Sequence, residues 1–351
     1  MATFNGKKLK IEIDGTSHSK EISAKVYSFP KFKFDEKELN DFMKRRQGGQ
    51  DAFSTPRKEE DRAEFSGVNN GEINGDFSFI IKNNNVKSKD YNNLYGKPRP
   101  SHADYASFLK DGTLDFSGGG RFSGRLTAPI CVIGGICKQY LRTFGIEIEA
   151  YVSQVGGVYA KSYKDGEITL NEIREKREEL FPSLDKKREI LSEIENARKD
   201  GDSVGGKIEC VVFNPKKAIG DNLFCGLEGK ISSLIYSVPA VKGVEFGLGF
   251  DFCKERGSRA NDQMEYKDNK VEFLSNNSGG INGGISNGEP ITIGVAIRPT
   301  PSIVKEQKTV DLINKETTII KIEGRHDSCI VKRAVPVIES VVAIAITDEL
   351  L

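Results

Sequence analysis

The chain is poor in several residue types that build functional sites in other proteins. Its 351 residues include three histidines, six cysteines and no tryptophan. No two cysteines form a Cys-x-x-Cys pair, and no histidine lies at zinc-finger spacing from them. This pattern argues against a structural metal site, so we expect no metal. Buried, reduced thiols are the default for such cysteines in a cytoplasmic protein.

An excess of charge of either sign is also missing. Lys+Arg number 52 against 51 Asp+Glu, a formal net charge of +1. Proteins that bind nucleic acid without sequence preference need a strongly basic surface, so this balance argues against a nucleic-acid partner. The arginines nevertheless gather locally, which suits a small polyanionic ligand. Ordinary surface charge is the alternative interpretation of any single cluster.

Long hydrophobic runs are absent as well. No apolar stretch approaches membrane length, and the first eight residues lack the apolar core of a signal peptide. We therefore expect a soluble, cytoplasmic protein without a membrane partner. With 37% hydrophobic residues and 20 phenylalanines, the chain can fill a sizeable core. Its length predicts two lobes or one large α/β body.

Helical and strand patterns alternate along the chain and predict an α/β architecture. Three polar stretches, 43–62, 83–98 and 251–270, lack core periodicity and are expected to form mobile loops. The predicted helices are a buried one over 128–144, a surface one over 183–201, one over 228–240 and an amphipathic one over 335–350. The predicted strands cover 146–153, 207–213 and 241–250.

One internal sequence match suggests a duplication. Residues 66–81 align without gaps on 279–294, with six identities at Gly, Asn and Ile positions. A duplicated glycine-rich loop that feeds a strand would give two pseudo-symmetric halves. Convergent turn chemistry is the alternative, because Asn and Gly are the usual residues at positive φ.

The three histidines each lie in a polar cluster, at Ser17-His18, at 99–104 and at His326-Asp327. Imidazoles beside Arg, Ser and Asp suggest one composite site that moves protons beside a bound anion. The glycine-rich segment 117–124 precedes the helix predicted from 128, and free amides at such a position attract phosphate. The segment matches neither a Walker A loop nor a dinucleotide-binding fingerprint.

These motifs resemble those of chorismate synthase, in order and over nearly the whole length. The phrases that carry the resemblance are RPSHADY (99–105), GGGRFSGR (118–125), GDSVGGKIEC (201–210), SVPAVKGVEFGLGF (237–250), GGISNGEPI (283–291), IRPTPSI (297–303) and GRHDSCIVKRAVPVIES (324–340). The resemblance implies an α/β (α+β) fold, a β-α-β sandwich with a helical core between two antiparallel-rich sheets and internal pseudo-symmetry. It places residues 1–351 in one domain and implies a homotetramer.

The family converts 5-enolpyruvylshikimate 3-phosphate to chorismate by anti-1,4-elimination of phosphate, with reduced FMN and no net redox change. Some members reduce their own flavin with NADPH, but the extension found in those of fungal type is absent at this length. External flavin reduction is therefore expected. The resemblance implies a catalytic set of His18, His102, Asp327 and Ser17. It implies a cofactor-binding set of Arg121, Phe122, Ser123, Pro239, Ala240, Gly283, Arg298, Pro299, Thr300, Pro301, Ser302 and Arg325. The implied substrate-binding set is Arg45, Arg46, Arg99, Arg125 and Arg333.

Several positions depart from the family pattern. Thr16 replaces its usual glutamate, Phe122 a serine, Leu126 a glutamate, Arg298 a lysine and Ser328 a proline. A catalytically weakened or inactive relative that binds flavin or a phosphorylated ligand is therefore an alternative. An interaction module for nucleic acid or protein is a second one, which the charge balance disfavours.

The histidine assignments predict the behaviour of one variant. His102→Ala should keep the fold and lower turnover by about two to four orders of magnitude, the usual loss for a positioned acid. Turnover and a thermal melt of the same preparation test this. Unchanged turnover would remove His102 from the mechanism.

Overall fold

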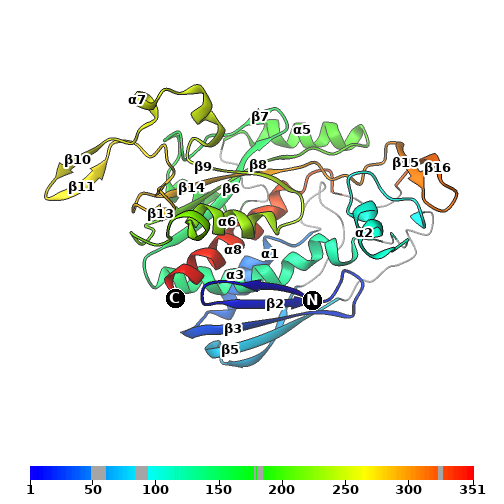
Figure 1. The fold of residues 1–351 in the computed structure, drawn as a ribbon, viewed down its shortest axis with the longest axis horizontal. Coiled ribbons are helices and arrows are strands. Elements are labelled where there is room, and N and C mark those ends of the chain that lie inside the picture. The colour runs from blue at the N-terminus through cyan, green and yellow to red at the C-terminus, as the bar shows by residue number, and fades with distance from the viewer. Residues whose placement is uncertain are drawn as a thin grey trace.

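The computed structural model describes residues 1–48, 61–83, 94–114, 116, 118–177, 179, 185–322 and 327–351. Two five-stranded sheets enclose a layer of helices (Figure 1). The first sheet has the order β1-β2-β3-β5-β4. It consists of β1 (Ala2–Asn5), β2 (Lys10–Asp14), β3 (Glu21–Lys33), β4 (Ala63–Asn69) and β5 (Glu72–Lys82).

The second sheet has the order β7-β6-β8-β14-β9, and its neighbouring strands are antiparallel. Its strands are β6 (Glu147–Val155), β7 (Val158–Tyr159), β8 (Gly206–Phe213), β9 (Val241–Phe246) and β14 (Ile291–Ile297). Three small hairpins complete the strands: β10 (Met264–Lys267) with β11 (Lys270–Phe273), β12 (Ile281–Asn282) with β13 (Ile285–Ser286), and β15 (Gln307–Asp311) with β16 (Glu316–Ile320).

Helices α3 (Thr127–Arg142) and α8 (Val331–Leu350) fill the space between the sheets (Figure 1). They approach so closely that a Cβ added at Gly134 would lie 2.3 Å from the Cα of Ser340. The other helices are α1 (Glu36–Lys44), α2 (Asp104–Asp111), α4 (Leu170–Lys176), α5 (Lys187–Lys199), α6 (Leu227–Tyr236) and α7 (Gly257–Ala260). Short 3-10 turns are η2 (Gly120–Phe122), η3 (Gly124–Leu126), η4 (Leu223–Cys225) and η5 (Gly249–Lys254).

The fold confirms most predicted elements and corrects three expectations. The C-terminal helix is not amphipathic: α8 is buried on nearly all sides, because it lies between the two sheets. The stretch 251–270 is not a plain loop, since it contains α7 and the first strand of a hairpin. Two of the six cysteines, Cys225 and Cys253, are exposed, and the other four are buried. No helix of the described residues is long and apolar enough to cross a membrane.

The internal sequence match between 66–81 and 279–294 corresponds to a repeated backbone conformation. The hairpin pair Asn69↔Glu72 recurs, 213 residues later, as the pair Asn282↔Ile285. Strands β5 and β14 each occupy the fourth position in their five-stranded sheet. Positive φ angles recur at four matched positions, namely Gly67/Gly280 (80° and 81°), Asn70/Gly283 (50° and 61°), Gly71/Gly284 (78° and 87°) and Gly75/Gly288 (94° and 101°). This agreement favours duplication over chance turn chemistry.

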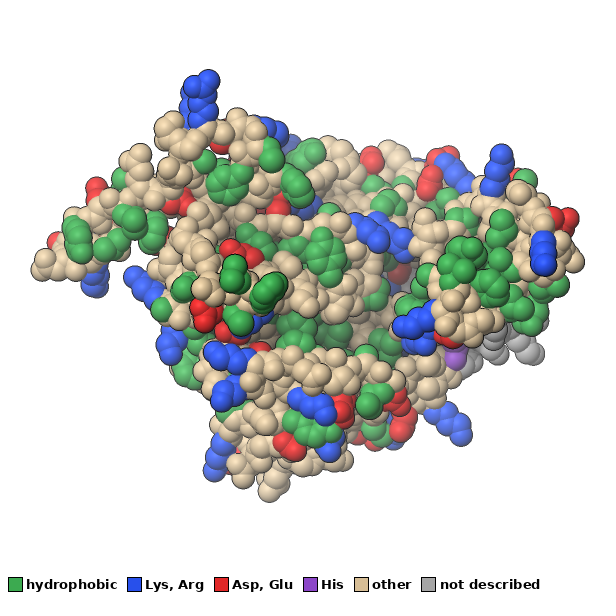
Figure 2. All heavy atoms as spheres, in the orientation of Figure 1, with side chains coloured by type: hydrophobic (Ala, Val, Ile, Leu, Met, Phe, Trp, Pro, Cys, Tyr) green, Lys and Arg blue, Asp and Glu red, His purple; other side chains and the backbone are tan. Residues whose placement is uncertain are grey.

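The hairpin of β10 and β11 projects from the body (Figure 1). Its turn, Asp268-Asn269, has positive φ at both residues, as two-residue hairpins prefer. Met264 is 60% exposed, Tyr266 81% and Val271 42%. Figure 2 shows hydrophobic side chains on this projecting arm. An isolated two-stranded hairpin is marginally stable, so an exposed apolar face on it needs a cover.

A buried carboxylate fixes the helical layer. Glu339 of α8 is fully buried and accepts a bidentate pair from Arg45 at 2.8 and 2.9 Å. Lys138 of α3 also donates to it, and the amide of Ala150 in β6 donates at 3.1 Å. Burial alone would raise the pKa of Glu339, but the charges of Arg45 and Lys138 outweigh it and lower that pKa to about 2.

This carboxylate predicts a pH-dependent stability difference. Glu339→Gln should lower the free energy of unfolding by about 3 kcal/mol at pH 7, because it removes the buried negative charge that binds Arg45 and Lys138. A lowered folded-state pKa gives stability that is present above the ordinary value of 4.5 and is lost as the pH falls toward about 2. Denaturant unfolding at pH 7, 4 and 3 measures the difference, which should shrink on acidification. The exposed Glu306→Gln is the control, and an equal loss in both variants would contradict the prediction.

Candidate active site

The turn that follows β2 carries the first histidine of the predicted site. The amide of Ser17 donates to the carbonyl of Gly120 at 3.2 Å. A Cβ added at Gly118 would lie 2.3 Å from Nε2 of His18, so the imidazole lies directly against this glycine. Ser17 Oγ and His18 Nε2 are buried and have no hydrogen-bond partner among the described residues. Two buried polar atoms of this kind need a partner that a ligand can supply.

The second histidine is held at the start of α2. His102 Nδ1 lies 3.0 Å from the carbonyl oxygen of Pro100, and Nε2 lies 2.8 Å from Oγ of Ser302. Burial, and next the charge of Arg99, lower the pKa of His102 to about 4. Its imidazole is therefore neutral at pH 7 when no ligand is bound.

Arg99 connects the two histidine segments. Its guanidinium forms a bidentate pair with Asp104 at 2.8 Å, and Nη2 also donates to the carbonyl of Gly118 at 2.9 Å. Gly118 therefore contacts His18 on one side and Arg99 on the other. The fold thus brings His18 and the segment that carries His102, 84 residues away in the sequence, to the same glycine-rich turn.

The exit of β14 forms another wall of the site. Arg298 donates to the carbonyl of Ser101 at 2.6 Å, and its amide donates to the carbonyl of Ala240 at 3.0 Å. Ala240 has a φ of 74°, a costly conformation for a residue with a Cβ. Arg298 Nε and Thr300 Oγ1 are buried without a hydrogen-bond partner in the described part of the chain. Unpaired polar atoms and a strained residue together mark this wall as a ligand site.

Arg46, Arg125 and Arg333 form a connected cluster with two carboxylates, of which Asp61 is buried and Asp327 is partly buried. Arg46 and Arg125 both donate to Asp61, which is 3% exposed. Arg333 donates to the carbonyl of Arg46 at 3.1 Å and pairs with Asp327 at 2.7 Å. Guanidinium groups bind oxyanions bidentately, so this cluster is a candidate contact for an anionic ligand. Burial lowers the pKa of Arg46, as expected for a cation taken from water.

Other predicted residues make contacts with groups other than the two imidazoles. Arg45 turns into the helical layer and binds Glu339. Arg121 pairs with Asp111 and lies 4.9 Å over the ring of Phe122, which is 46% exposed. Ser123 caps η3 by accepting from the amide of Arg125. Gly283 occupies the exposed turn between β12 and β13, and Pro239 is exposed at the end of α6.

Arg325 lies outside the described residues, as does His326. Sequence reasoning missed Asp61, Asp104 and Asn83, whose Oδ1 accepts from Arg125 at 2.8 Å. Asp104 has a sequence signal, because it follows Arg99 by five residues in the motif 99–105. Asp61 and Asn83 have none, since each lies at the edge of a polar stretch and becomes buried only through distant partners.

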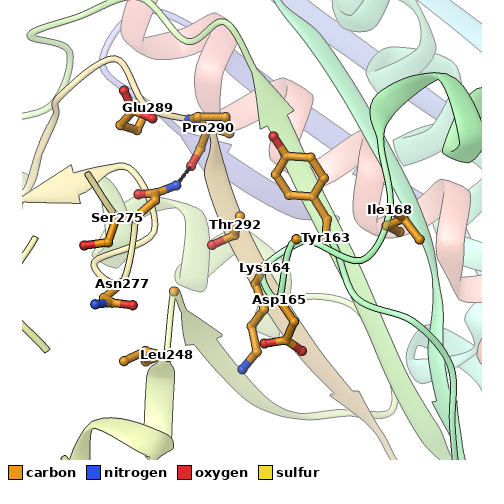
Figure 3. Close-up of a pocket in the computed structure, with 13 residues that line it drawn as sticks. Tyr163, Lys164, Asp165, Ile168, Leu248, Ser275, Asn277, Glu289, Pro290 and Thr292 are labelled. Atoms are coloured by element: carbon orange, nitrogen blue, oxygen red, sulfur yellow. Dashed lines mark hydrogen bonds between the residues drawn. The ribbon is translucent and has the colours of Figure 1, made fainter. Parts of the chain in front are cut away.

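A separate cavity of about 500 Å³ opens on the outer side of the second sheet (Figure 3). Tyr163, Lys164, Thr292 and Asn277 are among its lining residues, and none of the predicted site residues lines it. Thr292 lies near the start of β14, whereas Arg298 follows its end, six residues or about 20 Å farther along. The predicted site and this cavity are therefore distinct.

A family model described as "Chorismate synthase" matches residues 9–351. A protein of Korarchaeum cryptofilum named "Chorismate synthase" is 40% identical over 99% of this chain and 96% of its own length. One of Thermococcus kodakarensis with the same name is 40% identical over 99% of this chain and 97% of its own.

A solved structure titled "Crystal Structure of Chorismate Synthase" matches with a TM-score of 0.79 and 28% identity. The match covers 99% of this chain and 93% of that one. The chain belongs to the chorismate synthase family. It is accordingly a carbon–oxygen lyase that acts on a small-molecule substrate, and the predicted family and fold class are confirmed.

The contact between Gly118 and His18 predicts a specific variant. Gly118→Ala should displace the His18 ring, because the new methyl group would overlap Nε2. We expect turnover to fall at least about tenfold, since a displaced proton-transfer group loses much of its contribution. Gly112→Ala is the control: its φ of 73° resembles the 79° of Gly118, but no atom lies within 4 Å of the added Cβ. Both variants should lose about 1 kcal/mol of stability, and equal turnover in the two would contradict the role of the contact.

Proposed function

We propose that this chain converts 5-enolpyruvylshikimate 3-phosphate to chorismate by anti-1,4-elimination, with reduced FMN as cofactor. One observation supports the site most strongly. Ser17, His18, Arg298 and Thr300 each carry a buried polar atom that has no hydrogen-bond partner in the described part of the chain. They occur in segments that the structure links to Gly118 and His102. A ligand with several polar groups would satisfy them.

The reaction poses a physical problem that this set of residues can meet. An unactivated C–H bond and a C–O bond to phosphate both break, so the site needs cations, proton carriers and few waters. His18 and His102 are the proposed proton carriers: one serves the reduced flavin and the other the departing phosphate. Ser17 and Asp327 are proposed to pass a proton away from the flavin, and Arg333 fixes the carboxylate of Asp327.

The proposed substrate contacts use the buried arginines. Arg99, Arg125, Arg46 and Arg333 would neutralise the phosphate and carboxylates, since guanidinium groups bind oxyanions bidentately. Asp61 holds Arg46 and Arg125 toward each other and reduces their mutual repulsion. For Arg45, the bidentate pair with Glu339 favours an indirect role, which is to fix the end of α1 immediately before Arg46.

The proposed flavin contacts come from several segments. The wall 298–302 offers the unpaired atoms of Arg298 and Thr300, and Ala240 offers a backbone already held in a strained conformation. Arg121, Phe122, Ser123, Pro239, Gly283, Pro299, Pro301 and Arg325 complete the proposed set by resemblance. When bound, reduced FMN supplies electron density to the substrate while the phosphate departs.

Two further features belong to this proposal. We propose that an external donor reduces the flavin of this chain. NADPH is the source of electrons in family members that reduce their own flavin. The proposed assembly is a homotetramer, and the apolar face of the β10–β11 hairpin supports it as a surface that a neighbouring copy would cover.

An anaerobic assay tests the function. Protein mixed with dithionite-reduced FMN and 5-enolpyruvylshikimate 3-phosphate should produce chorismate, followed by its absorbance, and should release one phosphate for each chorismate formed. Omission of the flavin should abolish the product, because the elimination needs its electron density. Tight flavin binding without chorismate would instead identify an inactive relative.

A further inference from the structure

The hydrogen bond between Ser302 and His102 joins two segments that are 200 residues apart. Ser302 is 8% exposed and lies five residues after the end of β14, whereas His102 lies two residues before the start of α2. The distance between Ser302 Oγ and His102 Nε2 is 2.8 Å, a short and well-formed contact. It is the contact that fixes the second nitrogen of the imidazole.

The other nitrogen determines which group donates. His102 Nδ1 lies 3.0 Å from the carbonyl oxygen of Pro100, and a carbonyl can only accept. Nδ1 therefore carries the proton of the neutral ring, so Nε2 is left with its lone pair. Ser302 must then donate its hydroxyl hydrogen to Nε2. Both imidazole nitrogens are thus hydrogen-bonded in the neutral form.

On balance, the charges around His102 also favour its neutral form. Arg99 and Arg298 face His102 and disfavour its cationic form, while Asp104 favours it. Burial, and next Arg99, keep the pKa of His102 near 4 in the ligand-free protein. A hydrogen bond donated to a neutral base also stabilises the neutral form.

We propose that Ser302 is a positioning residue that holds His102 as a neutral base with Nε2 available to take up a proton. The proposal rests on the proposed function, and it gives Ser302 a role other than flavin contact. In this arrangement Nε2 becomes an acid only after it gains a proton, which an incoming phosphate dianion would favour by its charge. The hydroxyl of Ser302 can rotate to accept from the protonated ring, so it orients Nε2 in both states.

The small number of histidines makes a direct test practical. With three histidines in the chain, long-range proton–nitrogen spectra of 15N-histidine-labelled protein contain three imidazole systems. His18→Gln and His326→Gln variants would assign the signals of His102. In the wild-type protein at pH 7, Nε2 of His102 should show the chemical shift of an unprotonated, hydrogen-bonded nitrogen. A protonated Nε2 there would overturn the proposal, whatever the variants do.

Three variants of the same segment then separate the hydroxyl from general packing. Ser302→Ala should raise the pKa of His102 by about one pH unit, the shift expected when one hydrogen bond to the neutral ring is lost. Ser302→Thr keeps a hydroxyl and should retain the wild-type pKa. Thr300→Val removes a neighbouring buried hydroxyl that does not bond His102, so it should leave the pKa unchanged.

The outcomes distinguish this inference from the proposed function. An unchanged pKa in Ser302→Ala, or an equal rise in Thr300→Val, would overturn the role of Ser302 even in an active enzyme. The pH profile of kcat in Ser302→Ala should move with the pKa of His102, which a merely structural role would not produce. Failure of the wild-type protein to form chorismate would instead reject the proposed function, while the spectra would still report the Ser302–His102 pair.

Discussion

Glu339 is the point on which the arrangement of the layers depends. It is a fully buried carboxylate on α8, and it binds Arg45 at the end of α1, Lys138 on α3 and the amide of Ala150 on β6. One side chain therefore connects three helices and the second sheet. A buried charge of this kind is tolerated only where its partners are all in place, so it imposes one register on the helical layer. Arg46 follows Arg45 directly, and its position in the site is fixed by the same constraint.

Contacts of Gly118 and Arg99 connect the segments of the candidate active site. Gly118 lets the ring of His18 approach its Cα, and its carbonyl accepts from Arg99. Arg99 and its partner Asp104 set the start of α2, where His102 lies. Ser17, His18, Arg298 and Thr300 carry polar atoms that have no hydrogen-bond partner among the described residues. Polar groups already in place can stabilise a charged ligand without rearrangement.

Much of this could be predicted from local patterns and much could not. The helix over 127–142 and the strands 147–155 and 206–213 follow from their apolar-rich patterns, because most of these apolar residues are buried. The helix 331–350 was misread as amphipathic because its polar residues, such as Glu339, are paired inside the protein. The roles of Asp61 and Asn83 were invisible because their partners lie 15 to 64 residues away in the chain.

By itself the sequence determined the family, the order of the motifs and the residue types available for chemistry, because these depend on identity and spacing alone. It also contained the duplicated turn, since Asn and Gly at matched positions report positive φ. Only the tertiary structure decided which arginines are neutralised by buried carboxylates, which histidine is held neutral, and which polar atoms remain unpaired. These properties depend on partners that are distant in sequence, and local patterns do not identify such partners.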